Sequence, residues 1–219
     1  QGGFLTPIDL GGNLVGMDLS TDDNTLAVAD STNDGTHEWV HLVNLDSLTD
    51  TKAILPVPAA GGTRTVAFVA DGSLMVTSAW QAERLDMTTG TWSIAAAPGG
   101  LPGDVISASG DGTIIAAADS GSIPGFWGVY NVGTDQYVQN PDIPWFTYEI
   151  ATNCDGSQFA VPTYGGVLIY DKANNLLATI GTYAGQEPVG AAYHPVENEI
   201  FFPWEGTDEV RVYDTSTFA

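Results

Sequence analysis

Basic residues are scarce in this chain of 219 residues. Five lysines and arginines face 27 aspartates and glutamates, which gives a formal net charge of −22. A surface of this sign repels nucleic-acid phosphates and anionic lipids, so we expect neither nucleic-acid binding nor binding to a membrane surface. It attracts divalent cations or basic partners instead, and salt would screen its self-repulsion. A hydrophobic run long enough to span a membrane is also lacking, so we expect no membrane insertion.

Cysteine is nearly absent as well. Cys154 is the one cysteine, which excludes an intrachain disulfide. An oxidising compartment is still compatible with the sequence, because a chain of this length can bury a sufficient core without cross-links. The chain begins at Gln1 without a methionine. We interpret this start as that of a processed protein and expect it to be secreted or at the cell surface.

A sustained 3.6-residue apolar period is missing, which predicts almost no helix. Short apolar segments alternate instead with acidic turns, and this cassette recurs five times. The acidic turns are Asp22-Asp23-Asn24, Asp71-Gly72, Asp111-Gly112, Asp155-Gly156 and Glu197-Asn198. Their acidic residues lie 49, 40, 44 and 42 positions apart, which is the spacing of four-stranded propeller blades. Asp-Gly and Asx turns between β-branched segments are typical of hairpins.

We therefore predict an all-β fold in a single domain, a five-bladed β-propeller with four-stranded antiparallel blades. The predicted blades occupy approximately residues 13–60, 61–98, 101–140, 146–183 and 187–219. The last repeat ends after its third strand, whereas residues 4–10 resemble Ile54–Ala60, the predicted fourth strand of the first repeat. We expect this N-terminal strand to complete the last blade and to leave no open sheet edge.

The strand, Asp-Gly turn, strand, loop, strand pattern resembles the YVTN/NHL/WD40-like propeller repeats of secreted and cell-surface proteins. The resemblance covers essentially the whole chain. It implies the propeller fold and an extracellular location, but no particular activity, because these repeats are structural. Small five-bladed lectins are similar in blade number and size. The lactonase-like members of the superfamily share only the repeat pattern and have seven blades.

One large aromatic residue falls near the start of the third predicted strand in each repeat. These residues are Trp39, Trp80, Trp127, Tyr164 and Trp204. Because the corresponding loops emerge on one face of a propeller, the rings could form a platform that stacks on sugars beside Asp and Asn acceptors. The alternative is that the rings pack between neighbouring blades. Exposure of the rings distinguishes the two hypotheses.

A second candidate site is a partial calcium loop. Asp30, Thr32 and Asp34, followed by Gly35, match its first, third, fifth and sixth positions. The twelfth position is a histidine, so Glu38 would have to replace the bidentate glutamate of such loops. Calcium is thus a possible cofactor. The alternative is an Asx-turn loop with solvated carboxylates.

Enzyme motifs are missing: the sequence has no G-x-S-x-G, no H-E-x-x-H and no phosphate-binding loop. Glycoside hydrolysis by carboxylates at the ring centre is the leading enzymatic alternative, with Asp18, Asp104 and Glu149 as candidates. We expect instead a non-catalytic extracellular or cell-surface binding module, whose partner is a glycan or a cell-surface protein. A second alternative is a structural subunit that self-associates by exchanging its N-terminal strand between copies.

Overall fold

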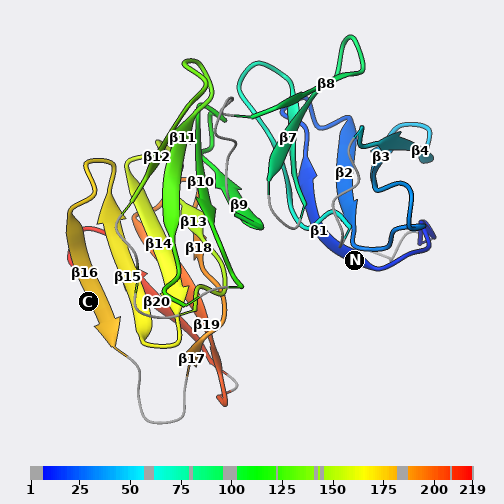
Figure 1. Cartoon of the computed structure of the whole chain (residues 1–219). Coiled ribbons are helices and arrows are strands. Elements are labelled where there is room, and N and C mark those ends of the chain that lie inside the picture. The colour runs from blue at the N-terminus through cyan, green and yellow to red at the C-terminus, as the bar shows by residue number, and fades with distance from the viewer. Residues whose placement is uncertain are drawn as a thin grey trace.

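A computed structural model describes residues 7–56, 62–78, 81–95, 103–121, 123–140, 143, 146–181, 187–207 and 209–218. These residues contain twenty β-strands and no helix, in agreement with the missing helical period. The described strands form five antiparallel sheets that follow one another along the chain, each counting four strands (Figure 1). The fold is therefore all-β, with the five four-stranded sheets of a five-bladed propeller.

The first four sheets have the same order in space as in sequence. The first contains β1 Leu14–Leu19, β2 Thr25–Asp30, β3 Trp39–Asn44 and β4 Thr49–Ile54. The second contains β5 Val66–Phe68, β6 Leu74–Thr77, β7 Ala82–Asp86 and β8 Thr91–Ile94. The third contains β9 Val105–Ala108, β10 Ile114–Ala118, β11 Trp127–Asn131 and β12 Gln136–Gln139. The fourth contains β13 Ala151–Thr152, β14 Gln158–Thr163, β15 Gly166–Asp171 and β16 Leu176–Gly181.

The fifth sheet has a broken first strand. It contains β17 Glu187–Pro188, β18 Ala192–Tyr193, β19 Glu199–Glu205 and β20 Val210–Asp214. The two short strands β17 and β18 pair with the same edge of β19, and β20 pairs with its other edge. The described residues of this blade therefore occupy three strand positions side by side.

The acidic turns have the geometry that their sequence predicts. The carboxylates of Asp71, Asp111 and Asp155 each accept a hydrogen bond from the backbone N–H two residues later, at 3.0–3.1 Å. The following glycine has a positive φ in all three turns, between 67° and 80°. Hydrogen bonds, first from the Ser109 hydroxyl and then from the Thr113 N–H, lower the pKa of Asp111. Much of the acidity of the chain thus belongs to its turns.

The predicted fourth strand of the first blade, Ile54–Ala60, is misplaced: residues 55 and 56 lie outside any strand, and residues 57–60 fall outside the described part of the chain. The fourth strand is β4, which pairs antiparallel with β3. Thr49 lies opposite Asn44 at one end of the pairing, and Ile54 lies opposite Trp39 at the other. A tight turn, in which Asn44 Oδ1 accepts from the Ser47 N–H at 2.8 Å and Leu48 has a φ of 55°, returns the chain at once. The strand was missed because it is outermost and largely polar, so it lacks an apolar pattern.

Closure of the ring by an N-terminal strand is not observed. Residues 7–10 lie outside any strand, and residues 4–6 fall outside the described part of the chain. The sheet of the first blade stands well apart from β19 and β20 in Figure 1. The described blades thus form an arc in which each blade packs on the next.

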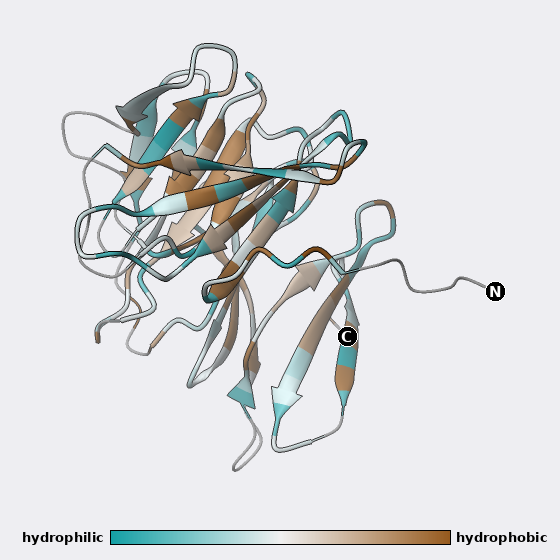
Figure 2. Ribbon diagram, turned by 90° about the vertical axis from the view of Figure 1, so that its right-hand side faces the viewer, coloured by the Kyte–Doolittle hydropathy of each residue, from teal (hydrophilic) through white to brown (hydrophobic). Residues whose placement is uncertain are grey.

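The core of the protein lies between the blades. Four clusters of buried residues join the first blade to the second, the second to the third, the third to the fourth and the fourth to the fifth. Figure 2 shows the apolar residues concentrated on the strands, with polar residues at the turns. The first strands of the blades, β1, β5, β9, β13 and β18, are neighbours in that order and line the inner side of the arc.

Candidate functional site at the inner strands

Two cavities open beside the inner strands of the first three blades. One has a volume of about 360 Å³ and is lined by Asp18, Phe68, Ser107 and Gly110, among others. The other has a volume of about 470 Å³ and is lined by Val15, Ser31, Arg64, Thr65, Asp104, Val105 and Ser120. Ligand pockets typically measure roughly 300–1,000 Å³, so either cavity is large enough for a small molecule.

The three carboxylates that we considered for glycoside hydrolysis are not brought together in either of these two cavities. Asp18 lines the first cavity and Asp104 the second, while Glu149 lines neither. Two of them bridge successive blades: Asp18 Oδ2 accepts from the Phe68 N–H at 2.7 Å, and Glu149 accepts from the Ala191 N–H. Each carboxylate thus has a separate structural partner.

Burial changes the proton affinity of two of these acids. Burial raises the pKa of Asp18, and the hydrogen bond from Phe68 opposes this rise. Burial also raises the pKa of Glu149, and the hydrogen bond from Ala191 opposes it. Perturbed pKa values occur in structural contacts as well as in active sites. Here the direct partners are backbone N–H groups of the next blade, so the shifts reflect packing between blades.

Asp104 holds an arginine at the second cavity. Its carboxylate accepts from the Ser120 N–H at 2.7 Å, from the Ser120 hydroxyl at 2.6 Å and from Arg64 Nη1 at 3.2 Å. The Arg64 side chain is nevertheless half exposed. The guanidinium is therefore bonded to Asp104 through Nη1, and the half-exposed Arg64 side chain forms part of the cavity wall. Sequence reasoning included Asp104 but missed Arg64, whose only signal was the scarcity of basic residues.

The aromatic residues do not form the common platform that we predicted. Trp127 is fully buried, with its ring centroid 4.8 Å from Tyr170 and 5.6 Å from Phe159. Trp204 is 2% exposed and lies within β19, where it packs toward the fourth blade. These two indoles are packed between blades, which was the alternative hypothesis. Their large apolar area favours that position.

The remaining aromatic candidates differ from one another. Trp39 is half buried, donates through Nε1 to Asp30 at 2.9 Å and has Lys52 Nζ 4.2 Å above its ring. Tyr164 is 53% exposed. Trp80 lies outside the described residues. A five-fold array of exposed rings is therefore not present, although Tyr164 is available at the surface.

The calcium-loop residues point in different directions. Asp30 is buried and accepts from the N–H groups of Asn13 and Thr32 at 2.8 and 2.9 Å, besides the Trp39 indole. Asp34 is exposed and accepts from the Thr36 and His37 N–H groups at 2.8 and 2.6 Å. The two carboxylates are thus held by separate sets of donors, one buried and one at the surface.

Glu38, the fourth proposed ligand, is fully buried. Its Oε1 accepts from the Gly62 N–H at 3.0 Å, and its Oε2 has no hydrogen-bond partner in the described structure. It therefore faces the second blade and not the Asp34 turn. Within the described ranges, no three His, Cys, Asp or Glu side chains are grouped so that they could hold a metal ion.

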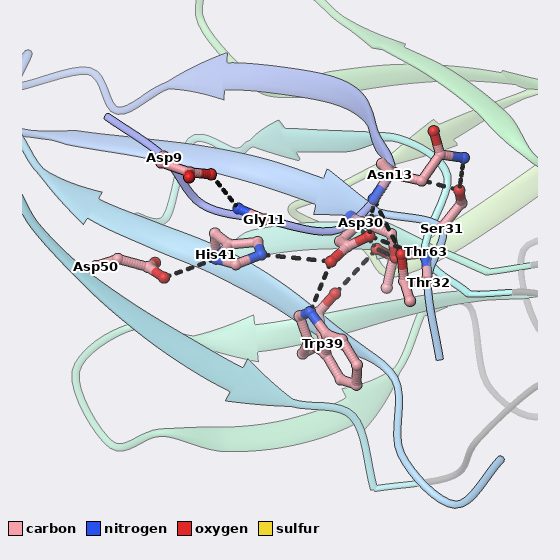
Figure 3. A network of polar contacts seen from close by, with 10 residues as sticks. All are labelled: Asp9, Gly11, Asn13, Asp30, Ser31, Thr32, Trp39, His41, Asp50 and Thr63. Atoms are coloured by element: carbon pink, nitrogen blue, oxygen red, sulfur yellow. Dashed lines mark hydrogen bonds and ion pairs between the residues drawn. The ribbon is translucent and has the colours of Figure 1, made fainter. Parts of the chain in front are cut away.

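A buried polar network replaces the expected metal loop (Figure 3). His41 is fully buried, with Nδ1 2.7 Å from Asp50 Oδ2 and Nε2 3.5 Å from Asp30 Oδ2. The Thr63 hydroxyl joins the network by donating to the Asp30 carbonyl and accepting from the Asp30 N–H. Burial raises the pKa of Asp30, but the hydrogen bonds outweigh it and lower the value to about 2. The network ties the segment around Asn13 to the first blade.

Comparison with known proteins supports the fold and leaves the activity open. No family model matches the chain, and no curated protein matches it in sequence. A solved structure of hydrazine synthase from Kuenenia stuttgartiensis is similar, with a TM-score of 0.72 at 16% identity. The match covers 93% of this chain and 65% of the other, so the chain spans about two thirds of that protein's length. At this identity the likeness concerns the fold alone.

The class that fold and comparison define is an all-β protein of propeller architecture. Nothing in the described part of the chain is a helix with the length and hydrophobicity needed to cross a bilayer.

Proposed function

We propose that the protein is a non-catalytic extracellular or cell-surface binding module, and that its ligand is a glycan carrying a carboxylate. The net charge of −22 repels anions at long range, but salt screens this repulsion and Arg64 offers a local contact for the carboxylate. The observation that carries this proposal is the cavity of about 470 Å³ with Arg64 at its wall. An arginine presents five N–H donors in a planar fork that fits a carboxylate. One nitrogen is already bonded to Asp104, and the half-exposed remainder can receive a ligand.

The rest of the cavity wall suits a sugar. The Ser31, Thr65 and Ser120 side chains offer hydroxyl groups, while Val15 and Val105 provide apolar surface against which a pyranose ring can lie. Ser120 and Asp104 fix the arginine in place, which lowers the entropic cost of binding. The proposed site replaces the aromatic platform, because Trp127 and Trp204 are buried.

Calorimetric titration with galacturonic acid and with galactose tests the proposal. We expect the acid to bind more tightly than the neutral sugar, and Arg64→Gln to abolish the difference. Lys172→Gln is the matched control, because it removes the same charge at an exposed turn away from the cavity. Equal binding of both sugars by the native protein, or a loss of binding in the control as large as in Arg64→Gln, would contradict the proposal.

A further inference from the structure

The cavity of about 360 Å³ carries a single charged group. Its walls come from the inner strands β1, β5 and β9 of three consecutive blades, and from the turns that follow β1 and β9. Asp18 is the one ionisable side chain among the residues that line it, and the others are apolar, hydroxylic or glycine. No residue lines both this cavity and the cavity beside Arg64, so the two sites are separate.

The Asp18 carboxylate is half-buried and has no cationic partner in the described part of the chain. Its Oδ2 accepts from the Phe68 N–H at 2.7 Å, and the Leu19 N–H also favours the charged form. None of the ion pairs among the described residues includes Asp18. Burial raises the pKa of Asp18, which means that the surrounding protein disfavours its charge. A carboxylate that lines the cavity is thus left without a counter-ion.

The side chains around Asp18 suit an apolar group. Phe68 is 8% exposed, and Ile106 and Ala108 pack against the core between the second and third blades. An anionic or purely apolar ligand in this cavity would remove water from Asp18 without compensating its charge. A cation would compensate the charge through a charge-assisted hydrogen bond. The cavity therefore favours a ligand that is both cationic and partly apolar.

Backbone carbonyls supply further acceptors at the cavity. On β5 the Thr65 carbonyl and the Val69 N–H bond to the segment of β6, so the backbone groups of Phe68 point away from β6. The Phe68 N–H follows this rule, because it bonds to Asp18. The Phe68 carbonyl lies on the same edge of β5 as this N–H. An ammonium group has three N–H donors, which the carboxylate, such carbonyls and water can accept.

We propose that this cavity binds a primary ammonium group carried on an unbranched alkyl chain. The ammonium bonds to Asp18, and the chain packs against Phe68, Ile106 and Ala108. A free alkylamine and the side chain of a lysine share this chemistry. The net charge of −22 attracts such cations to the protein. Calcium fits less well, because it takes roughly six to eight oxygen ligands and the cavity has a single carboxylate.

Amide NMR titration of the isotope-labelled whole chain tests the proposal. The signal to follow is that of the Phe68 N–H, because this group bonds to Asp18. Pentylamine hydrochloride should shift it saturably, together with the signals of Ser107 and Gly110 in the cavity wall. Pentanol, which has the same chain without the charge, should bind at least about tenfold more weakly, since a hydrogen bond to a charged group is lost. Absence of a shift with pentylamine, or equal binding of pentylamine and pentanol, would overturn the proposal.

Two matched variants test the carboxylate. Asp18→Asn removes the charge but keeps an acceptor for Phe68, and it should weaken pentylamine binding at least about tenfold. Asp46→Asn removes the same charge at an exposed turn outside the cavity and should bind like the native chain. Native-like binding by Asp18→Asn, or an equal loss in Asp46→Asn, would overturn the proposal. So would the same shifts produced by calcium chloride at equal ionic strength. If Asp18→Asn did not fold, the comparison of pentylamine with pentanol on the native chain would still decide.

A further titration distinguishes the two sources of the ammonium group. Nα-acetyl-lysine methylamide presents a lysine side chain without the charges of a free amino acid. If it shifts the Phe68 signal and competes with pentylamine, the cavity accepts a lysine side chain of a protein partner. If pentylamine binds and the lysine derivative does not, the ligand is a free amine. Absence of binding by both compounds would overturn the proposal.

Discussion

Asp18 on β1 accepts a hydrogen bond from the backbone N–H of Phe68 on β5, with Oδ2 2.7 Å from the nitrogen. The bond joins the inner strands of the first and second blades. A side chain of one blade thus satisfies a backbone group of the next, as Ser107 does for the N–H of Thr152 between the third and fourth blades. The inner strands are therefore held together by polar contacts in addition to apolar packing.

Comparing two substitutions of Asp18 separates its hydrogen bond from its charge. Asp18→Asn keeps an acceptor for Phe68 and removes a carboxylate whose pKa burial raises, so we expect unchanged or higher stability at pH 7. Asp18→Ala leaves a buried N–H without a partner and should be less stable than Asp18→Asn by about 1–3 kcal/mol. Urea unfolding measures both variants. Equal stability of the two variants would show that the bond contributes nothing.

Glu83→Gln should stabilise the protein at neutral pH. Burial raises the pKa of Glu83, the hydrogen bond from Gln81 lowers it, and the charge of Glu38 raises it further. Because the folded pKa exceeds the unfolded value, the native chain loses stability as the pH rises through the folded pKa. The amide cannot ionise and avoids this loss.

The melting temperature of Glu83→Gln should thus exceed that of the native chain at pH 7. The gain should vanish in acid, below the unfolded pKa. Glu197→Gln, at an exposed turn, is the control and should not show this pH dependence. A gain of the same size at all pH values would contradict the explanation by ionisation.

Asp30→Asn should remove part of the acid sensitivity of folding. The folded pKa of Asp30 is lowered to about 2, so its carboxylate stabilises the fold above the unfolded pKa. This contribution is lost as the pH falls through the folded value. The difference between the ordinary pKa of 3.8 and the folded pKa of about 2 corresponds to a stabilisation of about 2 kcal/mol. Denaturant unfolding between pH 6 and pH 2 should show a smaller loss in the variant than in the native chain, and parallel curves would exclude Asp30 as a source.

Alanine substitutions test the position of the aromatic rings. Trp127→Ala and Trp204→Ala should each cost about 3–5 kcal/mol, because they empty sites between blades. Tyr164→Ala should cost less than about 1 kcal/mol, since the ring is half exposed. Chemical denaturation distinguishes the two classes. Small losses at both tryptophans would restore the hypothesis of a surface platform.

The sequence predicted the β-strands well wherever burial and turn chemistry agree. Interior strands such as β6 and β10 are apolar because blades cover both of their faces, and each is preceded by an Asp-Gly turn. Outermost strands such as β4 carry no such signal, since solvent contacts them and polar residues are tolerated. The boundary error at Ile54–Ala60 follows from that difference.

The sequence alone determined the all-β class, the number of repeats and the acidic turns, because strand periodicity and Asx turns are local properties. Only the tertiary structure decided which acids approach which partners. Asp30 lies four residues from Asp34 but contacts Asn13, Trp39 and Thr63, and Arg64 meets Asp104 from another blade. Those contacts depend on how blades pack, and so does the burial of Trp127 and Trp204. Packing joins residues tens of positions apart, which no local pattern records.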